Sequence, residues 1–282
     1  MNHNRSILSL LVLSLFVLAS CADKASMPGK AFEGRIVQKL TFNAGAFGEL
    51  ATDPGSTGSN AQGAQSMMSG LALKADVIMY VKADKLAYEM SMLGGLFSFR
   101  SIIDPKTRKL TVISTMEKKA YVADLKDLDA HRNEINDSLE ASNIIDSLAK
   151  MAPHPTGKKE EIDGFDCEQY VTHIDKDGKK LDMEMWITTD PRLKFYDVMR
   201  DAIIGKKPTG SGGLEQLMAV FQPFAGKGKV PVKMTMKING KDLMTSEMTE
   251  MIEEKLDNKY FEVPKGFQVV EQDMKTPRQD SI

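Results

Sequence analysis

Apolar and polar residues alternate over much of the chain, and this pattern predicts a β-sheet. In one segment Leu181, Met183, Met185 and Ile187 occupy every second position, separated by Asp, Glu and Trp. In a strand, successive side chains point to opposite faces, so an apolar residue at every second position makes one face apolar. The same pattern predicts roughly ten strands, within residues 32–42, 75–82, 85–92, 97–104, 109–115, 118–123, 160–174, 181–188, 230–238, 241–256 and 260–270.

Short turn sequences separate these strands. Asp163–Gly164, Asp177–Gly178 and Asn239–Gly240 each stand between two alternating segments. Strands joined by such turns pair in opposite directions, so the sheet is expected to be antiparallel. Because one face of the strands is apolar and the other polar, we expect the sheet to be covered on one side only.

Short helices are expected at 61–71, at 125–151, which holds two helical segments, and at 214–221, which has amphipathic spacing. We expect them to cover the apolar face of the sheet. The predicted fold class is therefore α+β, a large curved antiparallel sheet, or open half-barrel, with short helices covering the concave face. No sharp change of composition divides it, so a single domain is expected at residues 31–270, followed by a polar tail at 271–282.

The N-terminal segment has the pattern of a secretory signal peptide. An apolar run at residues 7–18 follows Arg5. It is shorter than the ~20 residues that a membrane-spanning helix needs. The run ends in Leu-Ala-Ser-Cys, residues 18–21, which resembles the lipobox of bacterial lipoproteins.

This resemblance implies that residues 1–20 are removed as a lipoprotein signal peptide and that Cys21 receives fatty acyl chains such as palmitate. Two or three chains make a stable membrane anchor, and residues 21–30 would form a lipidated tether. Ala22 stands where an aspartate would resemble an inner-membrane retention signal. We therefore expect a protein of the bacterial cell envelope, lipid-anchored to the outer membrane and facing the periplasm. The alternative is an ordinary signal peptide that ends near a chance cysteine.

Composition excludes few functions but argues against nucleic acid as a partner. Lys and Arg number 37 against 39 Asp and Glu, so the chain has no excess of positive charge. It contains two cysteines, and lipidation of Cys21 would leave Cys167 without a disulfide partner. The unusual feature is methionine, with 19 residues against 1 tryptophan.

Methionine pairs two residues apart are the clearest local signal of a binding surface. Side chains at such positions point to the same face of a strand. Thioethers are flexible and adapt to ligands of variable shape. The candidate ligand-binding residues of an apolar hollow are Met79, Met90, Met183, Met185, Met218, Phe221, Met234 and Met236.

Two other interpretations of these methionines stay open. Methionine also fills irregular gaps in a core, here between a curved sheet and its helices. A Cu(I) site is the third interpretation, because soft thioethers select this ion. The faces that carry the methionine pairs hold no histidine and otherwise only Leu, Ile and Val, as a core does.

No arrangement of residues predicts catalysis. Cys167 lies on an apolar-leaning face and is expected to be a buried, inert thiol. The histidines His131, His154 and His173 lack ligand spacing. Adjacent glutamates at 160–161 would face opposite sides of a strand. We therefore predict no enzyme, no cofactor and no metal site.

Two motifs resemble known families. One is Ile-x-Gly-aromatic-x-Cys-x-x-Tyr followed by a tryptophan strand, at residues 162–170 and 186, and the other is Phe-x-x-Pro-x-Gly-aromatic, at 261–267. The first is similar to an uncharacterised domain-of-unknown-function family of bacterial envelope proteins, and the second recurs in the lipoprotein carriers LolA and LolB. The resemblance implies a concave sheet plugged by helices, which in the carriers receives acyl chains.

Two main hypotheses follow for the function. The first is a lipid-anchored periplasmic binding module for an apolar ligand, namely an acyl chain, a lipid or a segment of a lipoprotein. The second is a non-enzymatic structural or protein-interaction lipoprotein of the envelope, with a plugged hollow. A hydrolase is the third, and it lacks any nucleophile–base pair in the sequence.

Overall fold

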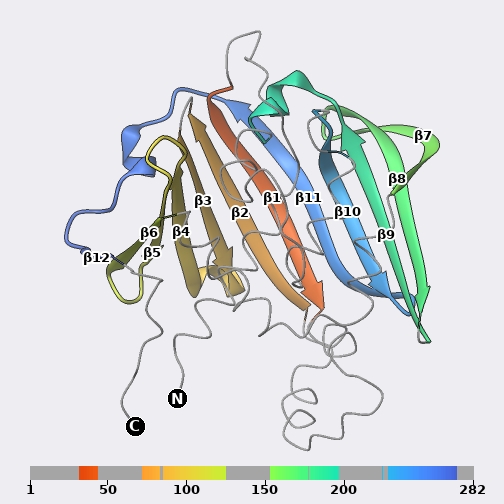
Figure 1. Ribbon diagram of the computed structural model, residues 1–282, viewed down its shortest axis with the longest axis horizontal. Coiled ribbons are helices and arrows are strands. Elements are labelled where there is room, and N and C mark those ends of the chain that lie inside the picture. The colour runs from red at the N-terminus through yellow and green to blue at the C-terminus, as the bar shows by residue number, and fades with distance from the viewer. Residues whose placement is uncertain are drawn as a thin grey trace, which may run out of the picture.

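The structure is a computed structural model that describes residues 32–43, 72–82, 85–124, 153–176, 178–196, 224 and 228–271. The described residues form one sheet of twelve strands (Figure 1). The strands are β1 (Gly34–Asn43), β2 (Ala72–Lys82), β3 (Lys85–Met92), β4 (Phe97–Asp104), β5 (Lys109–Ser114), β6 (Lys119–Asp124), β7 (His154–Ile162), β8 (Phe165–Lys176), β9 (Lys179–Thr188), β10 (Val230–Ile238), β11 (Lys241–Glu253) and β12 (Gln268–Glu271).

Strand β1 joins the two halves of the sheet. The strand order is β12-β6-β5-β4-β3-β2-β1-β11-β10-β9-β8-β7. Strands that are consecutive in the sequence therefore pair with one another from β2 to β6 and from β7 to β11. β1 pairs antiparallel with both β2 and β11. Figure 1 shows β1 near the middle of the sheet, between strands from the two ends of the chain. The expected antiparallel pairing is confirmed for all neighbours except β12 and β6.

The predicted α+β class is wrong, because the described residues are nearly all β. Apart from a helical turn that begins at Phe195, their helical elements with both ends described are three short 3-10 helices: η2 (Leu93–Gly95), η3 (Pro191–Lys194) and η5 (Asn258–Phe261). No short helices covering a concave face are seen among the described residues. From β2 to β6 the strands follow one another through short connections, which leave no length for an α-helix between them. The segments predicted as helices, 61–71, 125–151 and 214–221, lie outside the described residues.

The second face of the sheet is also covered over β2 to β6, so the expectation of one covered side is wrong there. Residues 254–267, here named the C-terminal strap, follow β11 and include η5. Leu256 and Phe261 of the strap are buried in one cluster with Tyr80, Ala87 and Ile102. Along their strands these three residues alternate with the buried residues of the other face of the sheet. They therefore lie on the face opposite to those residues.

Polar contacts fasten the strap to the sheet. The ammonium of Lys82 donates hydrogen bonds to the carbonyl of Leu256 (2.9 Å) and to Oδ1 of Asn258 (2.8 Å). The backbone N–H of Leu256 donates to the Glu33 carboxylate at 2.9 Å. The ring of Tyr260 stacks on that of Tyr80, with centroids 4.3 Å apart. The motif Phe-x-x-Pro-x-Gly-aromatic thus lies in a segment that covers one face of the sheet.

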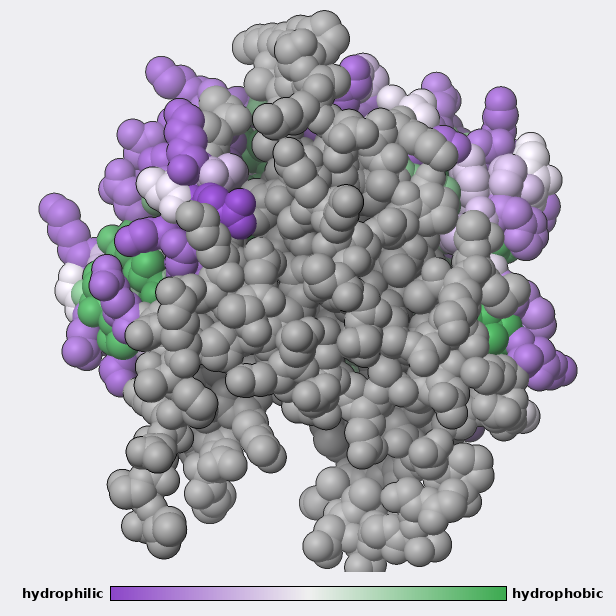
Figure 2. Space-filling view, viewed as in Figure 1, coloured by the Kyte–Doolittle hydropathy of each residue, from purple (hydrophilic) through white to green (hydrophobic). Residues whose placement is uncertain are grey.

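The two edges of the sheet differ. β12 pairs in parallel with β6 over four residues, and Val269 is 57% exposed there. β7, at the other edge, is exposed from His154 to Glu161 and carries lysine and glutamate side chains. In Figure 2 the visible described residues at both margins are mostly hydrophilic, with smaller hydrophobic groups among them. Charged residues on an edge strand oppose pairing with another sheet.

Candidate functional site

The candidate site is the sheet face that carries Met183, Met185, Met234, Met236 and Met244, here named the methionine face. The register places Met236 between Met244 and Met183 on adjacent strands. The next row places Met234 between Ser246 and Met185. Directly opposed residues of neighbouring strands have side chains in contact distance. Three strands, β9, β10 and β11, therefore present a continuous thioether surface.

This surface continues across the sheet as one apolar cluster. Phe42 of β1 is opposite Met244, and Leu40 is opposite Ser246. Both belong to the same buried cluster as Val77 and Met90 of the neighbouring meander. The five methionines of the methionine face are between 0 and 6% exposed. The apolar face that strand alternation predicted is thus buried over these strands.

The structure brings together five of the eight predicted ligand-binding residues. Met90, Met183, Met185, Met234 and Met236 lie in one cluster. Their burial does not test whether they bind a ligand, and that role stays a prediction. Sequence reasoning did not select Met244, although it alternates with Ser246 and Met248 along β11 and this spacing could have identified it.

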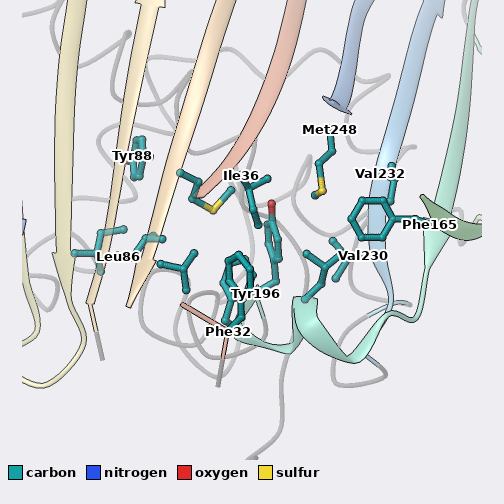
Figure 3. Packing of buried hydrophobic residues seen from close by; sticks show 14 of the residues in the cluster. Phe32, Ile36, Leu86, Tyr88, Phe165, Tyr196, Val230, Val232 and Met248 are labelled. Atoms are coloured by element: carbon teal, nitrogen blue, oxygen red, sulfur yellow. The ribbon is translucent and has the colours of Figure 1, made fainter. Parts of the chain in front are cut away.

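Met79 belongs to a second cluster at one end of the sheet. It lies there with Ile36, Tyr88 and Met248. Side chains from β1, β3, β8, β10 and β11 belong to this cluster together with Phe32 and Tyr196 (Figure 3). The remaining predicted residues, Met218 and Phe221, and the lipidation site Cys21 lie outside the described residues.

A cationic group stands at one end of the methionine face. The Lys229 ammonium donates a hydrogen bond to the Tyr170 hydroxyl and lies 4.7 Å from the centroid of that ring. The Tyr170 hydroxyl donates to the Glu168 carboxylate at 2.9 Å. Tyr170 is opposite Met185, and Phe224 meets its ring edge-on at 5.0 Å. The polar group formed by Lys229, Tyr170 and Glu168 is therefore directly next to the thioether surface.

Three polar side chains are buried in this face with an atom that has no hydrogen-bond partner. Among the described residues of this face these atoms are Oε1 of Gln38, Oγ of Ser101 and Oγ1 of Thr172. The amide of Gln38 donates to Ser246 at 2.5 Å, so its nitrogen is satisfied. Buried polar groups in native proteins are nearly always hydrogen-bonded. An unpaired oxygen therefore marks a position at which a ligand or water could donate a hydrogen bond.

The groups able to do chemistry are separated from one another. Burial of the Cys167 side chain, which is 3% exposed, raises the pKa of its thiol from 9.0 to about 11. The expected buried thiol is confirmed. His173 is exposed and contacts Asp182, whereas His154 is exposed on β7. His131 lies outside the described residues.

The described residues contain neither a metal-binding cluster nor a membrane-spanning helix. No group of three or more His, Cys, Asp or Glu side chains gathers there in an arrangement that could hold a metal ion. Within the same ranges no helix has the length and apolar character needed to cross a membrane.

Comparisons with solved structures give weak likenesses. An uncharacterized conserved protein from Thermus thermophilus is 10% identical and superposes with a TM-score of 0.39, over 94% of this chain and 99% of that one. MucB, solved in complex with MucA(peri), is 10% identical with a TM-score of 0.37, over 93% of this chain and 60% of that one. At these scores the likenesses carry no argument about fold or function.

A family comparison gives a firmer result. No curated protein matches the sequence. One family model does match, over residues 65–267, which extends from before β2 to the end of the C-terminal strap. The match takes in most of the described sheet and most of the chain. The chain therefore belongs to the DUF4412 family, a domain of unknown function.

Proposed function

We propose that this protein is a lipid-anchored, non-enzymatic binding module of the bacterial envelope, which faces the periplasm from the outer membrane and takes an apolar ligand on its methionine face. The ligand class is an acyl chain, a lipid or a segment of a lipoprotein. The observation that carries the proposal is the continuous thioether surface of β9, β10 and β11. A surface of flexible, polarizable side chains accommodates apolar ligands of different shapes.

The sequence supports the location. The apolar run at 7–18 ends at Cys21 in the pattern of a lipoprotein signal. Residue Phe32, the first described residue, follows after a short segment and is already buried in the core. A lipid on Cys21 would therefore hold the sheet close to the membrane surface, where apolar ligands are concentrated.

Binding of the neutral apolar dye Nile red tests the proposal. The full chain carrying Cys21→Ser, purified without detergent, is expected to bind the dye saturably and to release it to oleic acid. Met183→Gln and Met236→Gln should each weaken binding by about tenfold, because an apolar dye loses its contacts with the thioether and cannot hydrogen-bond the amide that replaces it.

The matched control is Met116→Gln, because Met116 is 73% exposed in the turn between β5 and β6. This variant should bind the dye like the parent chain. Unfolding midpoints of all three variants separate lost binding from lost stability. Dye uptake that does not saturate, or equal losses at Met116 and Met183, would contradict the proposal.

A structural or protein-interaction role is the second candidate, and one observation favours it. The methionines are nearly inaccessible, as expected if the hollow is already filled by the protein itself. Cross-linking in intact cells distinguishes the two functions. A binding module yields lipid or several transient clients, whereas an interaction lipoprotein yields one partner in fixed stoichiometry.

A further inference from the structure

The pairing register of β10 with β9 shifts next to the cationic group. Pro231 is opposite Ile187 and Lys233 is opposite Trp186, so Val232 is an extra residue in β10. A bulge of this kind re-aims the side chains beyond it. Lys229 lies just before β10, and its ammonium reaches the hydroxyl of Tyr170 at one end of the methionine face.

Lys233, on the other side of the bulge, is opposite Trp186 of β9. It is paired with Glu247 in the register, and its ammonium forms an ion pair with that carboxylate at 2.9 Å. Lys229 instead contacts the neutral hydroxyl of Tyr170. No carboxylate of the described residues forms an ion pair with Lys229. The Glu168 carboxylate accepts from the same Tyr170 hydroxyl but forms no ion pair with Lys229, so the ammonium keeps donors for an anion at this end of the methionine face.

A second observation points to a ligand at the same place. Thr172 follows Tyr170 on the same side of β8 and is opposite Met183. Its side chain is 3% exposed, and its hydroxyl has no hydrogen-bond partner. The thioether surface is thus bordered by the Lys229 ammonium, which precedes β10, and by the hydroxyls of Tyr170 and Thr172 on β8.

We propose that the methionine face binds an amphiphile with an anionic head group, such as a fatty acid, whose head lies at Lys229 and Tyr170 and whose tail lies along the methionine rows. This inference rests on the proposed function and deepens it by naming the ligand class. A charge-assisted hydrogen bond to a carboxylate is about twice as strong as a neutral one. The cation therefore selects an acid over an alcohol that has the same chain.

Displacement of Nile red by oleic acid and by oleyl alcohol, at a pH where the acid is ionised, tests the inference. The chain carrying Cys21→Ser should release the dye at roughly tenfold lower concentrations of the acid, as one lost charge-assisted hydrogen bond predicts. Lys229→Met should abolish this preference, and Lys229→Arg should keep it. Lys233→Met removes the same charge from the other face and should leave the preference unchanged.

The outcomes separate the two proposals. If both lipids displace the dye equally, or if Lys229→Met and Lys233→Met lose the preference equally, the head-group inference is wrong and the apolar binding function stands. If the dye does not bind saturably to the parent chain, both proposals are wrong. Should Lys229→Met fail to fold, the acid–alcohol comparison in the parent chain and in Lys229→Arg decides.

Discussion

At the scale of single residues, burial determines the chemistry of Cys167. Its thiol belongs to the same cluster as Phe165 and Val230, and loss of solvent is the largest cause of its raised pKa. Nearby Asp166 and Glu160 raise the pKa further, whereas a hydrogen bond with the backbone of Ile162 lowers it. A thiol in such surroundings stays protonated at neutral pH and is a poor nucleophile.

Alkylation of Cys167 at pH 8 should therefore be slow. A pKa of about 11, against 9.0 for a free thiol, reduces the thiolate fraction about hundredfold. Iodoacetamide labelling of the chain carrying Cys21→Ser, followed by mass spectrometry, measures the rate. Labelling in denaturant should be complete and fast. Rapid labelling of the native chain would contradict the burial.

The same pKa gives a pH dependence of stability with a defined sign. Below the unfolded pKa of 9.0 the thiol is protonated in both states, so the folded state keeps its full stability there. As the pH rises from 9 through about 11, the thiol ionises first in the unfolded state, and its contribution to the free energy of unfolding is lost. The protein should therefore become less stable at alkaline pH.

At the scale of elements, Gly34 allows β1 to lie against β11. A Cβ on Gly34 would stand 2.0 Å from the Ile252 carbonyl oxygen and 3.0 Å from Cα of Glu253. Backbone atoms cannot move aside as the end of a flexible side chain can. The central pairing of the sheet therefore depends on the missing side chain at this position.

Gly34→Ala should lower the free energy of unfolding by about 3 kcal/mol, the upper range for overpacking. Gly164→Ala is the control, because its Cβ would meet nothing within 4 Å although its φ is +80°. It should cost only ~1–2 kcal/mol, the strain of the left-handed region. Urea denaturation measures both, and an equal or smaller loss at Gly34 would refute the role of the close approach.

The strands themselves were largely predictable. Alternation placed β3 and β4 at 85–92 and 97–104, as the structure has them. The signal is local, because each strand shows its own buried face in its sequence. The bulge at Val232 was not predictable, because it depends on the register with β9. The contact of Lys229 with Tyr170 was not predictable either, because it joins residues 59 positions apart in the chain.

At the scale of the whole molecule, the C-terminal strap connects distant parts of the sheet. It begins beside β1 and β11, crosses the face opposite the methionine face, and leads into β12 at the edge beside β6. Its anchor is Phe261, which is buried against residues of β2 to β5. The strap therefore stabilises a meander that otherwise relies on local pairs.

Phe261→Ala should lower the free energy of unfolding by about 3 kcal/mol, because it removes a buried aromatic side chain. Val269→Ala, on the exposed strand β12, should change it by less than about 0.5 kcal/mol. Urea denaturation of the full chain compares the two variants. If Phe261→Ala costs no more than Val269→Ala, the strap does not contribute to the stability of the sheet.

The sequence by itself determined which segments are strands and which side chains, such as Met183 and Met236, share a face, because a period of two is a property of consecutive residues. Only the tertiary structure decided the pairing of β1 with β11, the parallel addition of β12 and the burial of a second face by the strap. These features join segments far apart in the chain, and local alternation contains no information about which distant strand or segment lies beside another. The predicted helical cover was wrong for the same reason, since an apolar face shows that it must be covered but does not show by what.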